Sequence, residues 1–288
     1  TLGDSALSNS SFPSLAETLP QDASNALLIG RIWVPGEGPY LVKVDAQHIT
    51  DLSALALTSS DLMEQDNVAQ RVGQHTGRTW PTAAVWHNTN PSHQDPSQAW
   101  FLAPTDLQAI KAAGVTFVAS MLERVIEEQA RGDASKAEAV RQAVVAVIGD
   151  NLRSVKPGSP ESAKLKEVLL AQGMWSQYLE VGIGPDAEIF TKSQAMSAVG
   201  SGFEVGLHPG SSWNNPEPEI VLVINSKGHV VGAAMGNDVN LRDFEGRSAL
   251  LLGKAKDNNA SCAIGPFIRL FDAHYTIDHV RKTDLSMT

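Results

Sequence analysis

Residues 214–238 read NNPEPEIVLVINSKGHVVGAAMGND and predict a β-hairpin around which the fold is built. The run IVLVI at 220–224 is apolar and rich in β-branched residues, which is typical of a strand. The segment SKG at 226–228 predicts the turn that brings the chain back. Pro216 and Pro218 cannot donate to a strand ladder, so the first strand should begin at an edge of the sheet or just outside it.

Three acidic residues stand at the open end of this hairpin. Glu217 and Glu219 share one face because alternate strand residues point the same way, and Asp238 lies near the end of the return strand. Three clustered carboxylates would repel one another and take up protons unless a cation neutralised them. Hard oxygen donors suit Mg²⁺, Mn²⁺ or Ca²⁺ better than zinc. The other interpretation is two solvated glutamates at a strand end and an unrelated aspartate.

The rest of the chain predicts an α+β fold that is mainly β. Residues 25–45 indicate a second hairpin, residues 105–152 read as mostly helical, and residues 163–173 predict a further short helix. After residue 174 short strand patterns alternate with Gly, Pro and Asn. We expect a small N-terminal β-rich domain at 1–100 and a metal-binding catalytic domain at 101–288, with the helical segment as an insertion.

Composition excludes several classes of protein. The formal net charge of −10 argues against binding nucleic acid, which needs a basic face. No apolar run approaches the roughly 20 residues that span a bilayer, and residues 1–15 show no signal-peptide pattern. The single cysteine, Cys262, rules out an intramolecular disulfide and fits a cytoplasmic protein. We therefore expect neither nucleic acid nor membrane as a partner.

Three motifs together resemble the fumarylacetoacetate hydrolase family. They are PEPE at 216–219 before the apolar strand, GNDVNLRD at 236–243, and KDNNASCAIGP at 256–266. The resemblance covers residues 107–288 and implies a fumarylacetoacetase-like mixed β-roll or sandwich as the catalytic domain. Members of the family continue after the last motif with further strands, whereas this sequence stops 22 residues after Pro266.

The resemblance also implies roles for individual residues. It assigns Glu217, Glu219 and Asp238 to a divalent metal, usually Mg²⁺, and places Lys256 in the active site. The segment EIFTK at 188–192 matches a Glu-x-Phe-x-Lys segment, which makes Glu188 an acid or base and puts Phe190 and Lys192 against the substrate. The pattern of the histidines, taken by itself, indicates structural or solvated side chains, with His208 the exception that is a candidate for a substrate contact.

One motif separates two reactions within the family. Its hydrolases carry a His–Glu dyad in a segment that here reads GVTFVASMLE at 114–123, where Ser120 stands in the histidine position and Glu123 is kept. Serine has no titration near neutral pH and cannot replace imidazole as a base. This pattern resembles the sugar-acid dehydratases of the family, which act on 2-keto-3-deoxy acids. Ser120 and Glu123 are therefore candidate active-site residues.

The function expected from these motifs is Mg²⁺-dependent dehydration of a 2-keto-3-deoxy-pentonate to 2,5-dioxopentanoate by a cytoplasmic homodimer or higher homo-oligomer. Glu188 and Lys256 are the candidate acid and base, in either order. One alternative is a hydrolase that cleaves a C–C bond in 2,4-diketo-3-deoxy sugar acids or another acylpyruvate. A second alternative is a non-catalytic protein that binds α-keto acids.

Overall fold

The computed structural model describes residues 12–114, 142, 155–171, 173, 175 and 177–286. Its main sheet, within these residues, has the strand order β4-β3-β2-β1-β12-β10-β9, and β5 pairs with β1 beside the end of β12. Two small two-stranded ribbons, β6 with β7 and β8 with β11, lie outside this sheet. All of the pairings between these strands are antiparallel. The expected mainly β fold with added helices is confirmed.

The strands span β1 Leu28–Val34, β2 Gly38–Val44, β3 His48–Asp51, β4 Thr79–Pro81, β5 Trp100–Leu102, β6 Ile110–Ala113, β7 Ile189–Ser193, β8 Asn214–Asn215, β9 Pro218–Ile224, β10 Val230–Asp238, β11 Asn240–Leu241 and β12 Cys262–Leu270. The helices span α1 Leu15–Thr18, α2 Ser59–Met63, α3 Val68–Gln74, α4 Thr82–Thr89, α7 Pro160–Ala171, α8 Gln177–Ile183, α9 Arg242–Glu245, α10 Leu252–Lys256 and α11 Ile277–Val280, with a 3₁₀ turn at Ala249–Leu251.

The predicted hairpin at 214–238 is present as β9 and β10. Asn225 closes its turn, because its side-chain oxygen accepts hydrogen bonds from the backbone N–H groups of Lys227 (3.1 Å) and His229 (2.9 Å). Gly228 has a φ of 78°, a conformation that costs glycine little and other residues more. The turn pairs Val230 with Ile224, and a register shift between Val230 and Gly232 then places Glu219 opposite Gly236.

Strand β1 lies in the middle of the sheet and divides its side chains between two apolar cores. Ile29 packs into a core that α2 and α3 cover, whereas Leu28 and Ile32 pack into a second core that α4 covers. Burying a side chain of this size contributes roughly 1.5–3 kcal/mol. Helices on both faces explain why six of the seven residues of β1 are buried.

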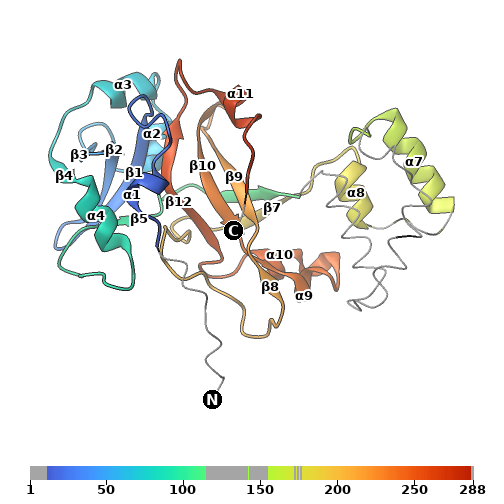
Figure 1. Ribbon diagram of the computed structural model, residues 1–288. Helices are drawn as coiled ribbons and strands as arrows, with labels where there is room; N and C mark the ends of the chain where they lie inside the picture. Colours follow the sequence, from blue (N-terminus) through green and yellow to red (C-terminus); the bar gives the residue numbers. More distant parts are fainter. Residues whose placement is uncertain are drawn as a thin grey trace.

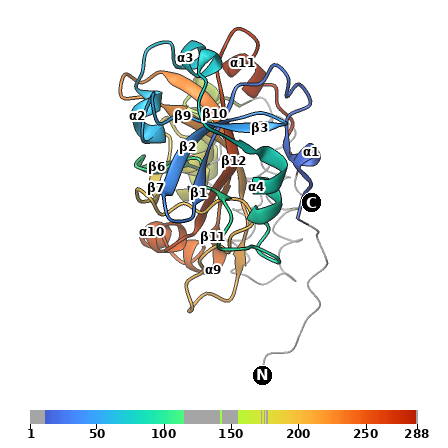
Figure 2. The same cartoon turned by 90° about the vertical axis from the view of Figure 1, so that its left-hand side faces the viewer.

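The sheet crosses the domain boundary expected at residue 100. Leu28 and Ile29 of β1 pair with Arg269 and Ile268 of β12, so strands from both parts of the chain form one layer (Figure 1). The division into two domains stays a prediction. In both views α3 and α11 lie at one end of the sheet, and α9 lies at the other end with β11 and α10 (Figures 1 and 2).

The expected helical region is only partly tested. Residues 110–113 were expected to be helical and are instead strand β6, because pairing with β7 overrides the helix propensity of this alanine-rich segment. Residues 115–141 and 143–152 of the predicted helical insertion lie outside the described residues. Helix α7 confirms the helix predicted at 163–173. In the part of the chain that the structure describes, every helix is too short or too polar to cross a lipid bilayer.

Candidate functional site

The open end of the hairpin brings the predicted acidic residues together. Glu217 immediately precedes β9, Glu219 lies on β9, and Asp238 is the last residue of β10. The backbone N–H of Asp238 donates to the Glu217 carbonyl at 2.8 Å, which holds the two ends side by side. The N–H of Glu217 donates to the Asn237 side chain at 3.0 Å. This pairing brings Glu217 and Asp238 together, and the convergence of all three carboxylates on one ion stays a prediction.

Lys256 enters this acidic group from helix α10. It is the last residue of the helix and only 2% exposed, and its ammonium group forms ion pairs with Glu217 and with Oδ2 of Asp238, the latter at 3.1 Å. The ring of Phe190 lies beside it, with the ring centroid 5.5 Å from Nζ. Burial alone would lower the pKa of Lys256, but the charges of Asp238, Glu217 and Glu245 outweigh burial and raise it.

The donor set fits a divalent cation in its chemistry. Oδ1 of Asp238 is buried and lies 3.1 Å from the ammonium of Lys192 as an ion pair, so this carboxylate already sits in a cation-binding environment. Burial, with the nearby charges of Asp238 and Glu217, raises the pKa of the Glu219 carboxyl. Carboxylate oxygens of this kind are suitable ligands for Mg²⁺.

Lys256 occupies part of the place that a metal ion would take. The described residues contain no group of three or more acidic, histidine or cysteine side chains already arranged around a common ion. Instead the ammonium group lies between Glu217 and Asp238. Glu217, Glu219 and Asp238 as a complete ligand set thus stay a prediction, and ion binding requires Lys256 to give up at least part of its contact with them.

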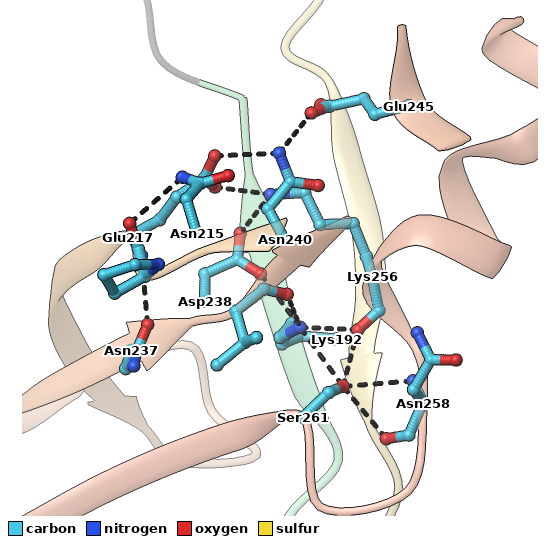
Figure 3. A network of polar contacts seen from close by, with 12 residues as sticks. Lys192, Asn215, Glu217, Asn237, Asp238, Asn240, Glu245, Lys256, Asn258 and Ser261 are labelled. Carbon is cyan, nitrogen blue, oxygen red and sulfur yellow. Dashed lines mark hydrogen bonds and ion pairs between the residues drawn. The ribbon is translucent and has the colours of Figure 1, made fainter. Parts of the chain in front are cut away.

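A second lysine, Lys192, and the asparagines Asn237 and Asn240 also belong to the polar network (Figure 3). Lys192 is 1% exposed and lies 3.1 Å from Oδ1 of Asp238; burial lowers its pKa, and Asp238 opposes this. Asn240 is also buried and donates to Glu217 (3.1 Å) and to Glu245 (2.5 Å). Sequence reasoning missed Asn237 and Asn240, although both lie within the quoted segment GNDVNLRD.

The ribbon strand β7 carries the residues of the Glu-x-Phe-x-Lys segment. Glu188 directly precedes the strand, and its carbonyl accepts from the N–H of Gly114 at 2.9 Å. Since alternate residues share a face, Glu188 and Phe190 point to the same side, about 6.8 Å apart along the strand. Phe190 faces Lys256, so Glu188 lies further from the acidic cluster on the same face.

Among the described residues, His208 lies outside this network. Nδ1 of His208 accepts from the N–H of Gly210 at 3.0 Å, and its ring packs on Phe244 at 5.2 Å. Its assignment to the substrate stays a prediction. Ser120 and Glu123 lie outside the described residues, and their predicted roles remain untested.

Comparisons with known proteins agree with the sequence motifs. A stretch of 95 residues is 36% identical to a probable 2-keto-3-deoxyxylonate dehydratase of Haloferax volcanii, covering 33% of this chain and 32% of the relative. A stretch of 81 residues is 37% identical to the 2-dehydro-3-deoxy-D-arabinonate dehydratase of Saccharolobus solfataricus, covering 28% and 27%. No protein-family model matches the chain.

Two solved structures share the fold. One is 2-keto-3-deoxy-D-arabinonate dehydratase complexed with magnesium and 2,5-dioxopentanoate, with a TM-score of 0.55 at 19% identity over 85% of this chain and 66% of that one. The other is the apo form of 2-keto-3-deoxy-D-arabinonate dehydratase, with a TM-score of 0.56 at 18% identity and the same coverage. The predicted resemblance to the pentonate dehydratase branch of the fumarylacetoacetate hydrolase family is confirmed. The matched stretches span about a third or less of the length of the curated relatives.

Proposed function

We propose that the protein catalyses the metal-dependent dehydration of a 2-keto-3-deoxy-pentonate to 2,5-dioxopentanoate. The observation that carries this proposal is that buried Lys256 forms ion pairs with Glu217 and Asp238. Phe190 lies beside this lysine, and Glu188 lies further along β7. The names of the similar curated proteins, both of which are dehydratases of 2-keto-3-deoxy acids, support the same reaction.

The arrangement of the side chains suggests how such a substrate would lie. The α-keto acid end would face the carboxylates Glu217, Glu219 and Asp238, and the rest of the molecule would run along β7 over Phe190. Lys256 contacts the carboxylates directly, so it would serve the C3 carbon next to the keto group. Glu188 lies about two residues further along the strand and would serve the hydroxyl at C4.

The reaction balances as the loss of one water molecule. Removal of a C3 proton and departure of the C4 hydroxyl with a second proton leave a C3–C4 double bond. A proton then moves from C5 to C3, which gives the C4–C5 enol, and the O–H proton of this enol moves to C4, which leaves an aldehyde at C5. General acid–base groups in such positions typically contribute about 10²–10⁴-fold each to the rate.

Glu217, Glu219 and Asp238 are the residues that would hold a divalent ion. When bound, such an ion supplies Lewis-acid polarisation of the keto oxygen and stabilises negative charge that develops there. Phe190 excludes water from one side of Lys256, which strengthens the electrostatic interactions in the site.

The direct test is a dehydration assay over a panel of 2-keto-3-deoxy acids, with and without Mg²⁺, that detects the semialdehyde. Turnover should require the ion and should fall about 10²–10⁴-fold in Lys256→Met and in Glu188→Gln. Cleavage of 2,4-diketo acids without any dehydration would establish the hydrolase alternative. Tight binding of the acids without turnover of either kind would overturn both enzymatic readings.

A further inference from the structure

The ammonium group of Lys192 donates its hydrogen bonds to other groups of the protein. An ammonium group has three N–H donors. Those of Lys192 face the carbonyl of Lys256 at 2.5 Å, the carbonyl of Val239 at 2.8 Å and the hydroxyl of Ser261 at 3.4 Å. Oδ1 of Asp238 lies 3.1 Å away as an ion pair. No donor of Lys192 is left for a substrate unless one of these contacts breaks.

An irregularity in β7 places this side chain in the interior. Thr191 pairs with Lys111 and Ser193 pairs with Ile110, so Lys192 is the extra residue between them. In a regular strand, neighbouring side chains point to opposite faces, yet Lys192 and Ser193 are both 1% exposed. An extra residue of this kind re-aims a side chain, and such bulges are frequent next to active sites.

The contacts of Lys192 join the two working parts of the site. Its bond to the carbonyl of Lys256 holds the last residue of α10, whose own ammonium reaches the carboxylates. The carboxylate of Asp238 lies between the two lysines, with Oδ1 facing Lys192 and Oδ2 facing Lys256. Ser261 reinforces this arrangement, because its hydroxyl lies 2.9 Å from the Lys256 carbonyl.

We propose that Lys192 is a positioning residue, which fixes Asp238 and the end of helix α10 in one frame and does not itself touch the substrate. The effect that we expect on kcat rests on the proposed dehydratase function. It replaces the substrate contact that the sequence motif suggested for this lysine with an indirect role through Asp238 and Lys256.

The first test is the variant Lys192→Met, with Lys111→Met as its matched control. Lys111 is exposed on the neighbouring strand β6 and donates only to Thr191 among its described contacts. Lys192→Met should lower kcat about 10–100-fold, the usual cost of losing a partner that orients a working group, with KM little changed. Lys111→Met should have near wild-type constants. A rise in KM at unchanged kcat in Lys192→Met would instead establish a substrate contact and overturn the proposal.

A second readout needs no activity. Hydrogen exchange of residues 252–262 should speed up in Lys192→Met and not in Lys111→Met, because Lys192, unlike Lys111, donates to the carbonyl at the end of α10. Equal protection in both variants would overturn the positioning role. If the wild-type chain dehydrates no acid in the panel, the proposed function fails while this measurement still decides the role of Lys192.

A chemical rescue covers the case in which Lys192→Met does not fold. Lys192→Cys, made in a Cys262→Ala background, leaves one thiol in the chain. The unfolded protein is alkylated with 2-bromoethylamine or with iodoacetamide and refolded beside an identically treated parent. The first reagent introduces an ammonium group and the second introduces a neutral amide, both at the chain length of lysine.

The ammonium form should recover kcat to within about threefold of the parent, whereas the amide form should keep the protection of residues 252–262 but stay about 10-fold slower. If kcat of the ammonium form does not exceed kcat of the amide form, the positive charge at position 192 does not act through Asp238, and the proposal is refuted.

Discussion

The substitution Gly114→Ala tests whether the position of Glu188 matters to the reaction. A Cβ at position 114 would lie 2.3 Å from Oε2 of Glu188, 2.8 Å from Cγ1 of Val181 and 3.2 Å from Cβ of Glu188. Ordinary contact begins at 3.4 Å, so the carboxylate must retreat by about 1 Å. The end of a glutamate side chain can make this movement without unfolding the strand.

A displacement of this size has a predictable kinetic cost. A misplacement of about 1 Å in a reacting group can reduce the rate about 100-fold, so we expect kcat of Gly114→Ala to fall about 10–100-fold. The KM should change less, because the carboxylates that would hold the α-keto acid lie at the other end of the site. The measurement is the initial rate of semialdehyde formation at saturating substrate and Mg²⁺.

The matched control is Gly73→Ala in helix α3, where an added Cβ meets nothing within 4 Å. It should leave kcat unchanged and stabilise the protein by about 1 kcal/mol, since alanine is the better helix former. The combination Gly114→Ala with Glu188→Asp should recover part of the lost rate, because the shorter side chain leaves room for the methyl group. Wild-type kcat in Gly114→Ala, together with an inactive Glu188→Gln, would refute the argument that the carboxylate must occupy its present place.

Three further outcomes follow from the described contacts. Asp238→Asn should abolish Mg²⁺-dependent turnover and weaken Mg²⁺ binding at least ~10-fold in calorimetry, whereas unchanged binding would remove Asp238 from the ligand set. Asp106→Ala should lower the free energy of unfolding by about 3–5 kcal/mol in urea titrations, because it leaves the buried Arg31 without its carboxylate; a loss below 1 kcal/mol would contradict this. Burial raises the pKa of the Cys262 thiol to about 11 from 9.0, so iodoacetamide at pH 8 should alkylate the native protein far more slowly than the unfolded one, and the thiol's contribution to stability should disappear between pH 9 and 11.

The hairpins were predictable because their signals are local. Short apolar runs rich in β-branched residues and a glycine-containing turn specify β9 and β10, and the same holds for β1 and β2. The pairing of β1 with β12 was not predictable, because it joins residues about 240 apart in the sequence and no local pattern in either strand identifies the other. Strand β6 was missed for a related reason: Ile110–Ala113 has the composition of a helix and becomes a strand only beside β7.

The same distinction between local and long-range signals applies to the residues of the candidate site. The hairpin itself brings Glu217 and Asp238 together, so their meeting could be inferred from residues 214–238 alone. The position of Lys256 between them depends on α10 and on the network around Ser261, which no local pattern encodes. The role of Lys192 is harder still to read from sequence, because it depends on a register shift that exists only in the paired ribbon.

Two buried lysines beside one aspartate make sense when the charges of the site are considered together. A carboxylate as buried as Asp238 is costly unless a cation accompanies it. Lys256 is the cation that can move, since its long side chain reaches the carboxylates from the end of a helix, whereas Lys192 is bound to two backbone carbonyls and a hydroxyl. If Glu217, Glu219 and Asp238 held a divalent ion, Lys256 would give up part of its contact with Glu217 and Asp238, whereas Lys192 could keep its bonds to the two backbone carbonyls. One cation would then replace another, and the buried carboxylate of Asp238 would keep a positively charged partner. The amine of Lys256 would lie next to the place proposed for C3 of the substrate.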